Sequence, residues 1–113
     1  MEDILTSVKK AIGLDEDYRV FDPDLVMFIN STFATLHQLG VGPSTPFSIT
    51  ADSQSCWHDF IGDDKRINSV KSYVFIKAKI IFDPPQSSFL LDSLKQQADE
   101  LEWRLMVVSE TKE

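Results

Sequence analysis

The chain has 113 residues, the length of one ordinary domain, and we expect residues 1–113 to form a single domain. Its formal net charge of −7 disfavours generic attraction to nucleic acid or to an anionic membrane. No apolar run reaches the roughly 18 residues that span a bilayer, and the acidic start at Glu2 and Asp3 differs from a signal peptide, so we expect a protein of the cytoplasm without a membrane partner.

Two amphipathic helices are predicted in the first third of the chain. The first covers residues 2–12 and ends at Gly13, because its apolar residues follow helical spacing. The second covers residues 22–39, with Asp22 as N-cap and Pro23 at the first helical position. The acidic residues 15–17 between the helices are expected to form a solvated connector. The core face of the second helix is predicted to include Ile29 and Phe33.

Residues 41–55 are rich in Gly, Pro, Ser and Thr, which predicts one irregular loop. Within this loop, apolar and polar residues alternate from Phe47 to Asp52, a weak strand signal that is too short to build a sheet alone. One or two helical turns are expected from Cys56 to Ile61.

A central helix is predicted before the sequence Asp83-Pro84-Pro85, with Asp63 or Asp64 as its N-cap. From Val70 onward this helix is apolar around nearly its whole circumference, so it must be buried on most sides. A domain of this size offers little surface to cover such a helix, so we expect some surface to remain for a partner. The predicted core residues of the helix are Val70, Val74, Ala78 and Ile81.

A long C-terminal helix follows, capped by Ser87 or Ser88. Leucine and alanine recur along it at intervals of three and four, forming a heptad-like seam in which Leu94 and Leu101 are predicted core residues. Phe89, Trp103 and Val107 lie roughly 160° or more from the middle of that seam. They serve either a partner or a loop of the same chain. The whole pattern predicts an all-α fold, a small bundle of about four helices.

Residues typical of catalysis or metal binding are sparse. His37 and His58 stand alone, without the companions of a known metal motif. Cys56 is the only cysteine, and its spacing of two from His58 places them on different faces of a helix, which is poor geometry for nucleophilic catalysis. We expect no enzyme activity, no metal and no cofactor.

Charge is segregated along the chain. Residues 65–82 contain five cations and no acid, which leaves 18 acidic and 6 basic residues elsewhere, a net charge of −12. This pattern suggests electrostatic complementarity within a subunit or between copies. The alternative is a small DNA-binding regulator that uses the basic central helix. Against it, Lys71, Lys77 and Lys79 point in different directions and alternate with apolar residues.

Four blocks of sequence are distinctive: His37–Pro43, Trp57–Asp64, Val70–Pro85 and Leu101–Leu105. In this order they resemble the head-tail connector proteins, or neck adaptors, of long-tailed phages and prophages of Gram-positive bacteria. The resemblance covers nearly the full chain, although no single block is a functional signature.

The resemblance implies a structural virion protein that forms a dodecameric ring under the portal protein, continues the DNA channel and supports the next neck or tail completion protein. Genomic DNA then passes through the lumen without specific binding. The expected location is the virion neck, with assembly in the host cytoplasm. In such proteins the C-terminal helix and tail engage the portal. Our contact candidates, taken from helix geometry, are Phe89, Trp103, Arg104, Val107 and Val108.

Overall fold

The computed structural model describes residues 2–52 and 54–111, with side chains as far as residue 107. In this part the chain folds into five helices: α1 (Ile4–Ala11), α2 (Asp22–Gln38), α3 (Trp57–Ile61), α4 (Ile67–Phe82) and α5 (Ser88–Thr111). The described residues form no strand, and Asp3 and Cys56 make one isolated antiparallel bridge. The predicted all-α fold is confirmed, with four longer helices and one short helix.

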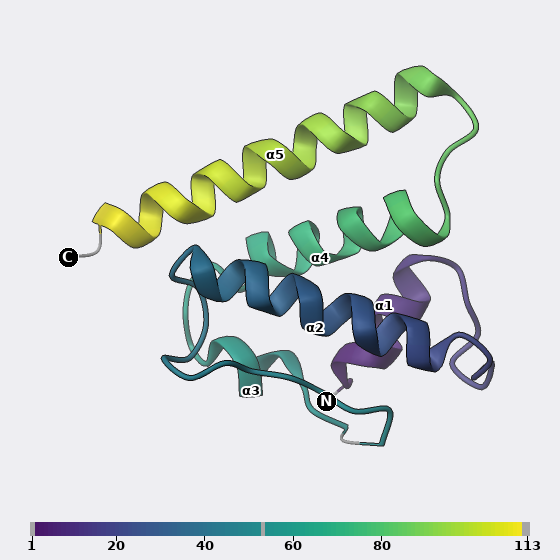
Figure 1. The fold of residues 1–113 in the computed structure, drawn as a ribbon, viewed down its shortest axis with the longest axis horizontal. Coiled ribbons are helices and arrows are strands. Elements are labelled where there is room, and N and C mark those ends of the chain that lie inside the picture. Colours follow the sequence, from purple (N-terminus) through teal and green to yellow (C-terminus); the bar gives the residue numbers. More distant parts are fainter. Residues whose placement is uncertain (1, 53, 112–113) are drawn as a thin grey trace.

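Helix α4 is the middle layer of the molecule (Figure 1). It packs against α5 on one side and against α1 and α2 on the other. Because neighbours cover it on both sides, Val70, Val74 and Ala78 are fully buried and Tyr73 is nearly so. The burial of these residues explains why the helix is apolar around most of its circumference.

An aromatic cluster fills the core beneath α2. Phe33 stacks on Phe60 of α3 with ring centroids 4.2 Å apart, and it meets Phe47 and Trp57 edge-on. The Trp57 indole nitrogen donates a hydrogen bond of 2.8 Å to the hydroxyl of Ser7 in α1. The short helix α3 is thus held through its rings to two helices that lie far from it in sequence.

The alternating segment in the loop does not pair with another strand. Ile49 is buried, but its backbone N–H and C=O both bond to the side chain of Asn30 in α2, at 2.8 and 3.0 Å. One amide side chain therefore takes the place of a neighbouring strand. In this segment Phe47 and Ile49 contact α2, whereas Ala51 is exposed.

Two of the predicted helix caps are wrong. Helix α2 has Phe21 as its N-cap, and the carboxylate of Asp22 pairs with the ammonium of Lys9 at 2.9 Å instead of capping. Helix α4 begins after Arg66, whose guanidinium binds Asp64 at 2.6 Å. In both cases the carboxylate binds a cation, and Asp64 also accepts the backbone N–H of Arg66 at 2.9 Å. At α5 the prediction holds, since the Ser87 hydroxyl accepts from Leu90 N–H at 3.4 Å.

The predicted core is also corrected in one place. Ile29 and Phe33 are buried as expected, but Ile81 is 57% exposed. At this end of α4 the next residue, Phe82, meets Phe28 of α2 edge-on at 5.6 Å, so Phe82 and not Ile81 faces the body. Leu94 and Leu101 are only half-buried because α5 packs mainly on a single neighbouring helix.

Candidate interaction surfaces

Helix α5 is an outer helix that buries one narrow face. Ala98 and Leu105 are the seam residues that become fully buried against the body, while the others in the described part stay partly exposed. The opposite side of the helix faces outward (Figure 1). An exposed helix with apolar residues on that side has surface available for a partner.

A polar contact fixes the rotation of α5 on α4. The buried Tyr73 hydroxyl donates a 2.9 Å hydrogen bond to the carboxylate of Glu102. Burial, together with this bond, raises the pKa of Tyr73 well above its usual value, so the phenol stays protonated as a donor. Because Glu102 faces α4, the adjacent Trp103 is turned away from α4, by the 100° step of a helix.

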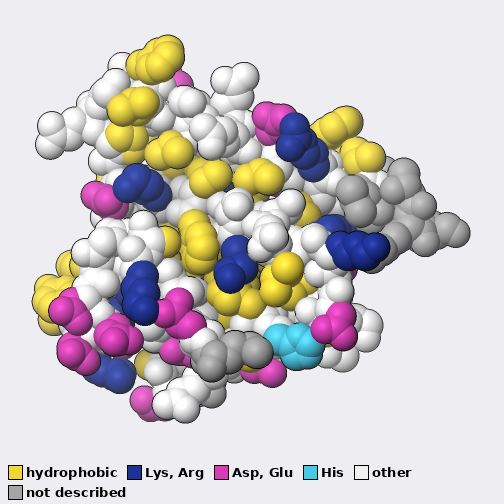
Figure 2. Space-filling view, turned by 180° about the vertical axis from the view of Figure 1, so that it is seen from behind, with side chains coloured by type: hydrophobic (Ala, Val, Ile, Leu, Met, Phe, Trp, Pro, Cys, Tyr) yellow, Lys and Arg dark blue, Asp and Glu magenta, His cyan; other side chains and the backbone are white. Residues whose placement is uncertain are grey.

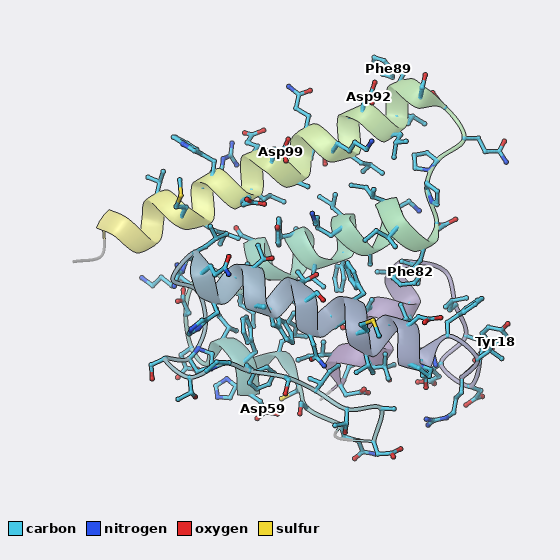
Figure 3. The ribbon with its side chains drawn as sticks, in the orientation of Figure 1. Tyr18, Asp59, Phe82, Phe89, Asp92 and Asp99 are labelled. Atoms are coloured by element: carbon cyan, nitrogen blue, oxygen red, sulfur yellow. The ribbon has the colours of Figure 1, made fainter. Side chains whose placement is uncertain are left out.

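The contact candidates on α5 fall into two groups. Phe89 is 78% exposed and lies near the start of the helix, pointing away from the body (Figure 3). Trp103 is 59% exposed, and Arg104 beside it is exposed and paired with Glu100. The two aromatic residues are 14 positions apart, a rise of about 21 Å along one helix. The structure therefore presents two separate exposed apolar groups on α5.

The structure gives less support to the remaining two predicted contact residues. Val107 is half-buried one turn beyond Trp103. The side chain of Val108 lies outside the described residues. Beside Phe89, Leu90 is 52% exposed and extends the apolar surface at the start of α5, although it was not among the predicted contact residues.

Sequence reasoning missed a further exposed apolar group between α1 and α2. Tyr18, Val20 and Phe21 are 43%, 67% and 42% exposed. Figure 3 shows Tyr18 at the end of the molecule where this connector turns. The acidic residues 15–17 suggested a purely solvated connector, and the only available signal was the apolar content of the four residues that follow them.

The residues considered for chemistry have local partners. The Cys56 thiol and backbone N–H both donate to the Asp59 carboxylate, at 3.4 and 2.9 Å, and these bonds lower the pKa of Asp59. His58 lies exposed 3.7 Å from Asp63. Among the residues that the structure describes, no group of three or more His, Cys, Asp or Glu is placed to hold a metal ion.

The basic helix does not present a continuous cationic face. Arg66 pairs with Asp64 and Lys79 with Asp83, while Lys77 lies 5.9 Å from the centre of the Tyr73 ring. Figure 2 shows the Lys and Arg side chains of one face dispersed among acidic and hydrophobic ones. DNA-reading helices instead lie free on the surface and gather their cations on one side.

Comparison with known proteins gives one match. A family model described as phage connector protein matches residues 4–112 of the chain. No curated protein and no solved structure matches it. Within the described residues, no helix has the length and apolar character needed to cross a membrane.

Proposed function

The chain belongs to the phage connector protein family, whose members are structural proteins joining head to tail, and from this premise we propose that it forms a dodecameric ring beneath the portal protein. The ring continues the DNA channel from the portal and offers a platform to the next neck or tail completion protein. The protein then resides in the virion neck after assembly in the host cytoplasm.

The observation that carries the portal contact is the two-sided character of α5. One side is fixed to α4 through Leu105, Ala98 and the Tyr73–Glu102 hydrogen bond. The other side leaves Phe89 and Trp103 exposed to solvent. Large aromatic side chains are the usual energetic anchors of protein interfaces. We assign these two residues, with Arg104, Val107 and Val108, to the portal contact.

The net charge of −7 supports passage of DNA without adhesion. Binding of a protein to DNA phosphates draws on the release of counterions by Lys and Arg, and an acidic wall provides few of these. The alternative of a DNA-binding regulator is disfavoured by the middle position of α4, which leaves its basic residues no common exposed face.

Replacing Trp103 by Ala tests the portal contact. We expect the variant to keep near-parental helicity and melting temperature, because the side chain is mostly exposed. Its affinity for the portal protein of the same phage should fall by about 30-fold or more, the loss typical of an interface anchor. Co-sedimentation with the portal measures the affinity, and thermal melting followed by circular dichroism measures stability.

Met27→Ala is the matched control, because Met27 is a 70% exposed apolar residue on α2. It should leave portal binding unchanged. The assignment of α5 is wrong if the Trp103→Ala melting temperature collapses while the binding of each folded molecule stays parental. Equal weakening by both substitutions would indicate a nonspecific apolar contact.

A further inference from the structure

The connector between α1 and α2 is held in a fixed shape by a buried lysine. Lys9 is 2% exposed, and its ammonium contacts the Asp22 carboxylate at 2.9 Å and the Glu16 carbonyl at 3.0 Å. A buried lysine is uncommon, and it is tolerated here because the Asp22 carboxylate compensates its charge and the Glu16 carbonyl accepts a second hydrogen bond. Within the turn, the Asp15 carbonyl accepts from Tyr18 N–H at 3.0 Å. Lys9 therefore fixes the connector at Glu16 and at Asp22, where α2 begins.

This pinned connector presents apolar side chains to solvent. We name residues 15–21 the connector knob. Tyr18 and Phe21 pack edge-on with ring centroids 5.7 Å apart, and Val20 beside them is 67% exposed. The exposed carboxylates of Glu16 and Asp17 flank these residues and make no ion pair within the described part of the chain. A preordered apolar surface loses little conformational entropy on binding.

A surface of opposite character lies between α4 and α5. We name it the lysine groove; its volume is about 170 Å³, and it is lined by Lys77, Ile80, Ile81, Lys95, Ala98 and Asp99. Ile81 is 57% exposed in it. Its lysines, Lys77 and Lys95, form no ion pair with the described residues, and they outnumber the one acid in the groove. The groove therefore combines exposed isoleucine with a net positive charge.

We propose that the connector knob of one copy docks into the lysine groove of a second copy. Both surfaces hold exposed apolar side chains, and their unpaired charges are opposite, so one chain supplies both halves of a complementary contact. The two surfaces differ, so the contact is heterologous and repeats from copy to copy until it closes a ring. This inference rests on the proposed ring and identifies the surfaces that hold neighbouring subunits together.

Charge reversal tests the contact. We expect Glu16→Lys with Asp17→Lys, and separately Lys77→Glu with Lys95→Glu, to raise the dissociation constant of self-association by about tenfold or more, a typical loss for opposed charges at an interface. Combining all four substitutions in one chain should restore association, because the charges are then exchanged. The matched control is Asp92→Lys, an exposed acid of α5 outside the groove (Figure 3). Sedimentation velocity over a concentration series, with the chain free and bound to its portal, gives the oligomeric state.

A second test uses disulfide cross-linking in a Cys56→Ser background. A chain carrying Val20→Cys and Ile81→Cys should form a ladder of head-to-tail oligomers on oxidation, whereas each single variant should give no ladder. Failure of the four-fold variant to recover association, or absence of the ladder, overturns the inference. A chain that stays monomeric both free and on the portal overturns it as well. If that monomer still co-sediments with the portal, the portal contact proposed for α5 stands, so the two failures are distinguishable.

Discussion

At the scale of single residues, a few polar side chains fix the geometry on which the surfaces depend. Lys9 and Asp22 hold the connector, and Tyr73 and Glu102 set the rotation of α5. A buried ion pair adds little net stability over apolar residues of the same volume, but removal of one partner is costly. Neither pair is evident from the sequence, because the partners are 13 and 29 residues apart.

Replacing Lys9 by Met should lower the free energy of unfolding by about 3 kcal/mol, since the buried Asp22 carboxylate loses its close cation at 2.9 Å and keeps only the exposed Arg19 guanidinium at 3.4 Å. Adding Asp22→Asn to Lys9→Met should recover part of that loss, because the buried charge that Arg19 compensates only from the surface is removed. Urea unfolding of the two variants measures the difference. Parental stability of Lys9→Met alone would show that the ion pair does not hold the connector.

Tyr73→Phe should change the alkaline stability. The pKa of Tyr73 is raised in the folded state, so its contribution is fully present below the unfolded pKa of about 10 and is lost as the pH rises above that value. Near pH 7 the free energy of unfolding of the variant should be about 1.5 kcal/mol lower than that of the parent. This is the lower end of the range for a hydrogen bond to a charged group. Above pH 10 its stability should fall less steeply than that of the parent. Urea unfolding at pH 7 and pH 10.5 measures both effects, and identical pH slopes would refute the assignment.

At the scale of elements, apolar periodicity was sufficient to predict α2, α4 and α5, because each has a long stretch with a clear helical pattern. The start of α2 could not be predicted correctly, since Asp22 binds Lys9, which only the folded chain brings near, and at α4 the Asp64 carboxylate binds its near neighbour Arg66. The strand signal in the loop failed for a similar reason. Asn30 supplies the hydrogen bonds that a second strand would have made.

Introducing Asp in place of Val74 should prevent folding. Val74 is fully buried in the middle layer, and an unpaired buried charge costs several kcal/mol against a total stability of about 5–15 kcal/mol. Ser72→Asp, at an exposed position of the same helix, controls for the added charge and should melt within a few degrees of the parent. A cooperative melt of the Val74 variant near the parental temperature would show that α4 is not the core helix.

At the scale of the whole molecule, the sequence predicted one group of exposed apolar residues and missed another. Phe89 and Trp103 could be assigned to the outer side of α5 because each residue of a regular helix is rotated by about 100° from the last, so its position in the sequence gives the direction of its side chain. Tyr18, Val20 and Phe21 lie in an irregular connector where spacing gives no direction, so only the structure shows their exposure. The order of sequence blocks along the chain indicated the connector family, and the match over residues 4–112 confirms it.

Imaging of the purified chain together with its portal protein tests the central claim most directly. Class averages from electron microscopy should show a closed ring of twelve copies, coaxial with the portal and open to its channel, which persists when the salt concentration is raised. The ring should be lost or incomplete with Trp103→Ala and retained with Met27→Ala. Isolated copies scattered on the portal, or no attached density at all, would contradict the account.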